Sequence, residues 1–165
     1  MPEVQLSSFD PTRDLSMLAA WLRRPHVAQW WGDPEQALSA VRKHSVATGA
    51  LIEADARPVG YLCWQTPSQE ELAAAGLGDL PGDLVDVDIM IGEPDALGRG
   101  VGPEALSQLL TRLRADGVRV VGLAAAIANR RALKAYEKAG FRPFRDFEEA
   151  GQDMRYLVRT VGAAV

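Results

Sequence analysis

The pattern of apolar and polar positions along the chain predicts strands that alternate with helices. An apolar run over residues 84–91 is typical of a buried strand, although it carries Asp86 and Asp88. Gly92 then ends the run. From Pro103 onward apolar residues recur at helical spacing, and proline suits a first helical turn because its missing N–H has no partner there. This stretch therefore predicts a strand, a glycine-rich turn and a helix.

The other elements are predicted in the same way, from the spacing of apolar residues and from the glycines and prolines that end each run. Strands are predicted at residues 4–9, 51–55, 59–65, 118–124, 141–147 and 154–160. Helices are predicted at residues 11–24, 34–45 and 130–139, with one helical turn near 70–75. No element is predicted for residues 25–32. Early strands joined by a hairpin and later strands separated by helices imply a mixed sheet with helices on both faces, in a single domain spanning residues 1–165.

Composition narrows the function classes. The chain has 165 residues, 47% of them apolar, and a net charge of −4, which argues against a nucleic-acid surface. Cys63 is the only cysteine and lies in a strand-like run, so a buried, inert thiol is expected. With only His26 and His44, a metal site is not expected. The chain lacks a signal-peptide pattern and a membrane-spanning run, so a soluble, cytoplasmic protein without membrane partners is expected.

Glycines stand at every second position between the strand and the helix, at Gly98, Gly100 and Gly102. Backbone amides of such a turn, together with the positive end of a helix, form a site for an anion such as a pyrophosphate. A tight connection without a ligand is the alternative. The turn is not a P-loop, because no Lys-Ser or Lys-Thr follows it, and its spacing is not that of a dinucleotide-binding turn.

The run Leu97-Gly-Arg-Gly-Val-Gly102, followed later by Asn129 and Ala135-Tyr-Glu-Lys-Ala-Gly-Phe141, resembles the GNAT superfamily of acyl-CoA-dependent N-acyltransferases. Trp30-Trp31-Gly32 and Val87-Asp88 resemble the aminoglycoside 6′-N-acetyltransferases of that superfamily. Residues 91–100 also resemble siderophore-type lysine N-acyltransferases, which carry histidine where this chain has Asp88. The resemblance implies an α/β (α+β) GNAT fold, whose central mixed sheet is mostly antiparallel with helices on both faces.

The resemblance also implies acetyl-CoA as co-substrate, without a metal. It assigns cofactor binding to the strand end, the glycine turn and a later helix cap: Ile89, Met90, Ile91, Leu97, Gly98, Arg99, Gly100, Val101, Gly102 and Asn129. Leu97 departs from the glutamine or arginine that the superfamily usually has there. Arg99 can equally be an ordinary loop arginine, and Asn129 can equally serve only as a helix cap.

Acetyl transfer to an amine needs a neutral amine, whereas a primary amine is mostly ammonium at neutral pH. A carboxylate near the thioester can bind the ammonium and take its proton. Asp88 is the candidate base, unless it and Asp86 only mark the polar face of the strand. By resemblance Tyr136 is the partner of the departing thiolate, although it can also be a core residue.

Acceptor binding is assigned to an aromatic pair and four carboxylates: Trp30, Trp31, Asp86, Glu148, Glu149 and Asp153. Residues 58–98 contain acidic side chains but no lysine or arginine. This stretch is either a solvated acidic surface or an electrostatic funnel for a cationic acceptor. Drug-modifying relatives carry an aspartate near the position of Ala124, which leaves the acceptor less defined than the fold.

These observations predict direct transfer of an acetyl group from acetyl-CoA to a primary amine, with the 6′-amine of an aminoglycoside as the best match. A lysine-type or siderophore-related amine is the first alternative. A non-catalytic acyl-CoA-binding module is the second. The partner is a small-molecule amine, and the protein is expected to be a monomer or a homodimer.

Overall fold

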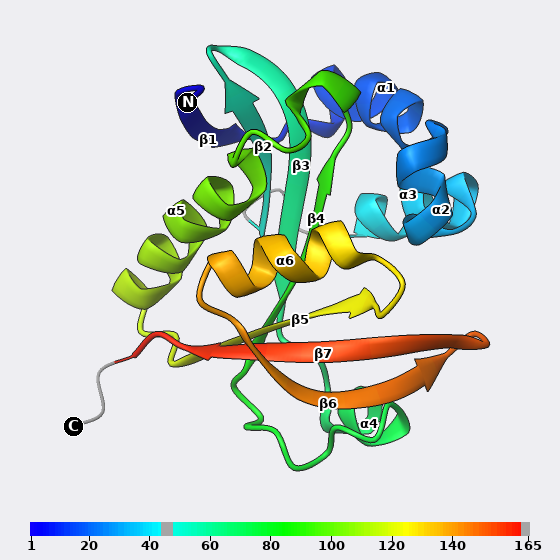
Figure 1. The fold of residues 1–165 in the computed structure, drawn as a ribbon, viewed down its shortest axis with the longest axis vertical. Coiled ribbons are helices and arrows are strands. Elements are labelled where there is room, and N and C mark those ends of the chain that lie inside the picture. Colours follow the sequence, from blue (N-terminus) through cyan, green and yellow to red (C-terminus); the bar gives the residue numbers. More distant parts are fainter. Residues whose placement is uncertain (44–47, 163–165) are drawn as a thin grey trace. The chain divides into compact units, whose positions relative to one another are not determined.

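The protein is described by a computed structural model that covers residues 1–43 and 48–162. Its strands are β1 (Val4–Ser8), β2 (Gly49–Ala54), β3 (Arg57–Gln65), β4 (Val85–Ile91), β5 (Val120–Ala126), β6 (Arg142–Glu149) and β7 (Gln152–Thr160). Its helices are α1 (Pro11–Leu22), α2 (Pro25–Trp31), α3 (Pro34–Lys43), α4 (Gln69–Ala74), α5 (Val101–Ala115) and α6 (Arg130–Lys138), with a short 3₁₀ turn at Pro94–Ala96 (Figure 1).

The seven strands are hydrogen-bonded in the order β1-β2-β3-β4-β5-β7-β6. Strand β4 pairs with β5 in parallel, whereas β1 with β2, β2 with β3, β5 with β7 and β6 with β7 are antiparallel. The predicted mixed, mostly antiparallel sheet is therefore confirmed. By its internal contacts the chain divides into two compact units, residues 1–63 with 89–105 and residues 64–88 with 106 onward. That the whole chain is one domain stays a prediction.

Most predicted elements are present, with differences at their ends. Helix α2 was not predicted, because its seven residues are too few for a helical period to be recognised. Helix α5 begins at Val101 rather than Pro103, so Gly102 belongs to the helix. The predicted end of the helix that corresponds to α3, at Ser45, lies outside the described residues.

In the first unit, helices α1, α2 and α3 contact one another (Figure 1). The Asp10 side chain accepts a hydrogen bond from the Thr12 amide, and this cap together with Pro11 begins α1 where the sequence predicts. Buried apolar side chains of the helices pack with those of β2, β3 and β4 around Trp21 and Tyr61. Cys63 is a buried free thiol in this core, as expected.

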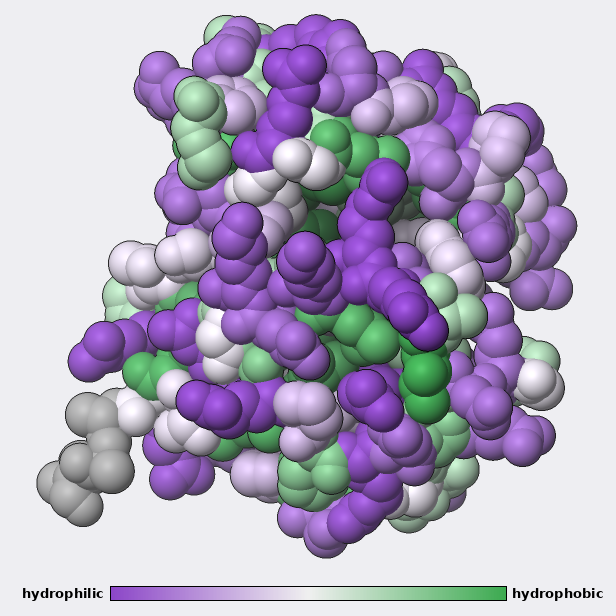
Figure 2. Space-filling view, viewed as in Figure 1, coloured by the Kyte–Doolittle hydropathy of each residue, from purple (hydrophilic) through white to green (hydrophobic). Residues whose placement is uncertain are grey.

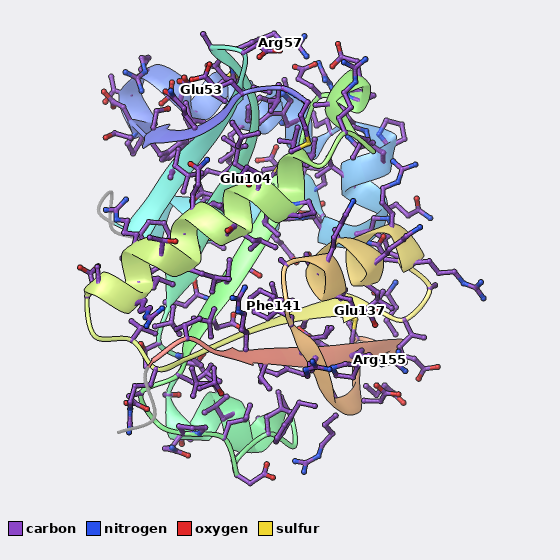
Figure 3. All side chains as sticks on the ribbon, turned by 60° about the vertical axis from the view of Figure 1, so that its left-hand side comes forward. Glu53, Arg57, Glu104, Glu137, Phe141 and Arg155 are labelled. Atoms are coloured by element: carbon purple, nitrogen blue, oxygen red, sulfur yellow. The ribbon has the colours of Figure 1, made fainter. Side chains whose placement is uncertain are left out.

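In the second unit, β6 and β7 form a long hairpin whose strand β7 pairs with β5 (Figure 1). Figure 3 labels Phe141, which is buried at the beginning of β6. A smaller cluster of Leu72, Leu77, Leu80, Leu84 and Tyr156 packs against β5 and β7 side chains. Burial of this kind stabilises a fold by about 25 cal/mol for each Å² of apolar surface. The unit thereby fixes β7 against β5, which determines where Tyr156 lies.

Hydrophilic residues dominate the face of the protein in Figure 2. Among the described residues, Met1 and Phe144 are the large hydrophobic side chains with high exposure. No helix within residues 1–43 and 48–162 is long and apolar enough to cross a membrane.

Candidate active site

Strand β4 carries two carboxylates on one face. Val85 and Val87 are buried, so Asp86 and Asp88 project to the opposite face, as alternation along a strand requires. Asp86 is partly buried and Asp88 is exposed. The paired register of β4 with β5 covers Val85 and Asp86 and ends before Asp88. The two predicted carboxylates therefore lie side by side, in different environments.

Asp86 is held by two neutral donors. The Tyr156 hydroxyl donates to Asp86 Oδ1 over 2.8 Å, and Gln65 Nε2 donates to Asp86 Oδ2, also over 2.8 Å. Burial raises the pKa of Asp86 to about 7, and the charges of Asp88 and, more weakly, Glu149 act in the same direction. The two hydrogen bonds oppose this rise only in part. Asp86 is therefore a carboxyl that binds its proton much more tightly than an exposed aspartate does.

A glycine in β5 makes this arrangement possible. A Cβ placed on Gly122 would lie 2.3 Å from the Tyr156 hydroxyl oxygen, so any larger residue would displace the ring. Ala124 stands opposite Tyr156 in the register of β5 and β7. The side of β5 near Asp86 thus holds a tyrosine ring over small residues, and no carboxylate stands at Ala124.

Tyr136 lies on α6 and is buried. Burial first, and then the negative charges of Asp88 and Asp86, raise the pKa of its hydroxyl above the usual range. The hydroxyl is therefore protonated at neutral pH and can donate to an anion. Asn129 caps the same helix, since its side chain accepts a hydrogen bond from the Ala132 amide over 3.3 Å. Its helix-cap role is confirmed, and a contact with the cofactor stays a prediction.

The tip of the β6–β7 hairpin carries three exposed acidic residues, Glu148, Glu149 and Asp153, here called the hairpin carboxylates. Glu148 and Asp153 stand directly opposite each other in the register, where like charges destabilise a sheet. The charge of Glu149 is felt at Asp86. The fold thus brings part of this hairpin near the β4 carboxylates. In the same way, the charge of Asp88 acts on the hydroxyl of Tyr136.

Arg155 is the neighbouring cation on β7 (Figure 3). It forms a two-contact ion pair with Asp146, with N–O distances of 2.8 and 3.1 Å. The nearby charge of Glu137 on α6 raises the pKa of the same guanidinium further. The charge of Arg155 is therefore already balanced by Asp146, and Arg155 does not neutralise the hairpin carboxylates.

The glycine turn lies in the first unit. Gly98 and Gly100 have φ angles of 73° and 78°, which side chains other than glycine rarely adopt. The Glu104 amide donates to the Gly100 carbonyl over 3.2 Å, closing the first turn of α5. The amides of Val101 and Gly102 precede that bond, so the helix itself offers them no acceptor. The turn thus presents backbone donors at the positive end of a helix, and their binding of an anion stays a prediction.

The end of β4 is anchored by side chains of α1 and α2. His26 Nε2 lies 2.9 Å from the Ile91 carbonyl oxygen, and Arg24 donates to the Gly92 carbonyl over 2.8 Å. Trp21 and Arg24 also donate to Glu93, and these bonds keep the pKa of its carboxyl below its ordinary value. The backbone that is predicted to orient a pantetheine arm is therefore held rigidly from one side.

The other predicted residues of the first unit lie in ordinary surroundings. Trp31 packs against the core of the helices, whereas Trp30 is half-buried and is not part of that cluster. A role of either tryptophan in acceptor binding stays a prediction. Arg99 is exposed in the glycine turn and its charge is felt by Asp95, while Leu97 follows the 3₁₀ turn.

The acidic stretch between residues 58 and 98 is less free than its sequence suggests. Of its eight carboxylates, four form ion pairs with arginines from elsewhere in the chain: Asp79 with Arg145, Asp83 with Arg119, Glu93 with Arg24 and Asp95 with Arg57. Four of the eight charges are therefore paired within the protein, and a funnel for a cationic acceptor stays a prediction. The charges that act on Asp86 come from Asp88 and from Glu149 of the hairpin carboxylates.

Sequence reasoning missed Gln65 and Tyr156, the two residues that hold Asp86. Both lie at unremarkable positions of strands, and only pairing with distant segments brings them to Asp86. Gly122 offered the one available signal, because a glycine inside a strand often marks a close approach. No group of three or more metal-ligating side chains occurs in the part of the chain that the structure describes.

Residues 10–148 match the family model of the acetyltransferase (GNAT) domain. This chain belongs to the GNAT acetyltransferase family. Enzymes of this family use acetyl-CoA without a metal, so the chain is an acetyl-CoA-dependent acetyltransferase by family. The predicted family and fold class are both confirmed.

Among characterised proteins it is 30% identical over 146 residues to aminoglycoside N(6′)-acetyltransferase type 1 of Klebsiella pneumoniae, an alignment that covers 78% of this chain and 69% of the relative. The same figures hold for the enzyme of that name from Serratia marcescens. The GNAT fold is shared with solved aminoglycoside acetyltransferase AAC(6′)-Ib in complex with coenzyme A and kanamycin, at a TM-score of 0.76, 24% identity, and coverage of 96% of this chain and 95% of that one. The chain is thus similar to aminoglycoside 6′-N-acetyltransferases.

Proposed function

We propose that this GNAT enzyme transfers an acetyl group from acetyl-CoA directly to a primary amine of a small polycationic acceptor, most simply the 6′-amine of an aminoglycoside. The observation that carries the proposal is the group of acidic side chains around Asp86 and Asp88, with the protonated Tyr136 hydroxyl beside them. Relatives named for this activity support the choice of acceptor.

In the proposed reaction the amine nitrogen forms a bond to the thioester carbon while the carbon–sulfur bond breaks. Asp88 attracts the ammonium and takes its proton, directly or through water. Tyr136 donates to the departing thiolate, and its raised pKa suits that role because the hydroxyl keeps its proton until an anion forms. In this reaction Asp88 therefore accepts one proton, and Tyr136 donates one hydrogen bond or proton.

The residues predicted to hold acetyl-CoA fit its chemistry. Amides at the beginning of α5 would donate to the pyrophosphate, and the positive φ angles of Gly98 and Gly100 support a close backbone approach. Residues 89–91 form the end of β4 beyond its paired register with β5, and their backbone groups can pair with the amide-bearing pantetheine arm like an added strand. Because β4 carries these groups next to Asp88, the same strand would orient both the thioester and the base.

One observation favours the alternative, a lysine-type acceptor. Half of the acidic stretch is neutralised by arginines, so fewer free carboxylates remain for a highly charged drug. An assay that follows coenzyme A thiol release from acetyl-CoA, with aminoglycosides, linear polyamines and lysine derivatives as acceptors, decides between the two. The aminoglycoside proposal expects the highest kcat/KM for a drug with a free 6′-amine and no transfer to a 6′-hydroxyl analogue. Binding of acetyl-CoA without transfer to any of these acceptors would leave only a binding module.

The role of Asp88 is tested in the same assay. Asp88→Asn should lower kcat/KM by about 10²-fold or more, the usual effect of losing a positioned base, with acetyl-CoA affinity unchanged. Glu70→Gln, an exposed carboxylate on α4, is the matched control and should keep wild-type rates. Wild-type turnover by Asp88→Asn would exclude Asp88 as the base.

A further inference from the structure

Asp86 is surrounded by neutral donors and by other carboxylates, and no cation is among the groups that act most strongly on it in the described structure. Its hydrogen-bond partners, Tyr156 on β7 and Gln65 on β3, are both neutral. The charged groups whose fields reach it are Asp88 on β4 and Glu149 on β6, and both are acidic. The hydroxyl of Tyr136 on α6 is the remaining titratable group that senses these carboxylates. A fixed charge at Asp86 would therefore be costly, and a proton is the natural compensation.

Gln65 is able to meet either protonation state of Asp86. Its Oε1 atom is buried and has no hydrogen-bond partner among the described residues. The two ends of an amide differ only in donor and acceptor character. With Nε2 toward Asp86 the amide suits an ionised carboxylate, and with Oε1 toward it the amide would accept from a protonated one. The side chain can thus serve either state of Asp86, as the Tyr156 hydroxyl can.

We propose that Asp86 is a positioning residue of the acetyl-transfer site, which forms with Asp88 one carboxyl pair that holds and releases a proton together. The inference rests on the proposed function, because it takes Asp88 as the base. When Asp86 is ionised, its negative charge makes Asp88 a stronger acceptor for the proton that the amine loses. When Asp86 is protonated, that assistance is absent, and Asp88 is a weaker base.

The pair accounts for both the position of Asp86 and its neighbours. The side chains two residues apart on one strand face are close enough to couple, and the charge of Asp88 acts on Asp86. Tyr156 favours the ionised form of Asp86 by donating to it. Gly122 leaves the space that this tyrosine needs. The tyrosine and glycine thereby tune a proton equilibrium at the reacting centre.

The pH dependence of kcat/KM distinguishes this role from a structural one. In wild type the acid limb should lie near pH 7. Asp86→Asn should move it at least one pH unit lower and reduce the plateau rate, because Asp88 then lacks the neighbouring charge. Tyr156→Phe should move the limb upward, since it removes a donor that favours ionised Asp86. Glu70→Gln should leave the profile unchanged. The proposal of a coupled carboxyl pair would be overturned if the acid limbs of all the variants coincided, or if Asp86→Asn and Tyr156→Phe shifted the limb in the same direction.

A titration of the free protein separates this inference from the proposed function. Carboxyl ¹³C NMR should show Asp86 titrating near pH 7, with its midpoint lowered in Asp88→Asn. If acetyl transfer depends on Asp88 but Asp86 titrates like an exposed aspartate in both proteins, the inference alone fails. If no amine is acetylated, the proposed function fails and the titration still decides whether the pair exists. Should Tyr156→Phe not fold, Gly122→Ala, which forces the hydroxyl away, replaces it with the same expected upward shift.

Discussion

Replacing Asp86 by asparagine should change how the stability of the fold depends on pH. The pKa of Asp86 is about 7 in the folded chain against an ordinary value of 3.8. Between these two values the folded state binds the proton more tightly than the unfolded state. The contribution of Asp86 to stability must therefore fall as pH rises from 3.8 to about 7, and then stay level. The asparagine side chain of Asp86→Asn carries no such proton, so the variant lacks this loss.

The magnitude follows from the same difference. At 1.36 kcal/mol for each pKa unit, ionising Asp86 costs at most about 4 kcal/mol of folding free energy. Asp86 keeps some exposed surface, and solvent screening reduces that figure to about 2 kcal/mol. Part of this cost is already present at pH 5. The free-energy difference between variant and wild type should consequently change by about 1–2 kcal/mol between pH 5 and pH 8, in favour of the variant.

Urea unfolding at the two pH values measures this change directly. Comparing each variant with wild type cancels the titration of carboxylates that all the proteins share, and any constant cost of the asparagine cancels between the two pH values. Asp153→Asn, an exposed hairpin carboxylate, is the control and should follow wild type. If the difference in unfolding free energy between Asp86→Asn and wild type is the same at pH 5 and pH 8, the pKa of Asp86 is not raised by folding, and the prediction is refuted.

Three further changes test the remaining parts of the site. Gly100→Val should abolish coenzyme A binding by calorimetry, because φ is +78° and the new Cβ would lie 3.1 Å from Met1 Sδ; Gly117→Val, also at positive φ, should still bind. Tyr136→Phe should slow turnover about tenfold or more without changing the melting temperature, and equal rates would return Tyr136 to the core. Neutralising the hairpin carboxylates together should raise KM for a tetra-amine more than for a mono-amine, an effect that high salt should remove and that equal changes would contradict.

Local signals explain why so much of the fold could be predicted. Caps and prolines act within a few residues, so the beginning of α1 at Pro11 and the cap of α6 at Asn129 were both predicted correctly. The glycine turn before α5 belongs to the same class, since its geometry depends on the residues at Gly98 and Gly100 themselves. The family resemblance followed from that turn, and the comparisons confirm it.

Tertiary structure alone decided which carboxylate is perturbed. The sequence singled out Asp88 and Asp86 as neighbours on a strand, but alternation cannot say that one is exposed and the other enclosed. Asp86 meets Gln65 from 21 residues away and Tyr156 from 70 residues away, and the charges of Asp88 and Glu149 oppose the effect of these two hydrogen bonds on its pKa. A pKa depends on burial and on charges in space, so strand pairing had to be known before the titration of Asp86 could be.

The acidic stretch shows the same division. Its composition was evident in the sequence and suggested one continuous negative surface. Arginines 36 to 69 residues distant along the chain neutralise half of it, among them Arg145 at Asp79 and Arg119 at Asp83. Charge counted along the sequence therefore overstated the field that an acceptor meets, because ion pairs form between residues that only folding brings within a few ångströms. The sequence by itself determined the elements, the turn and the family, and tertiary packing determined which charges remain available for chemistry.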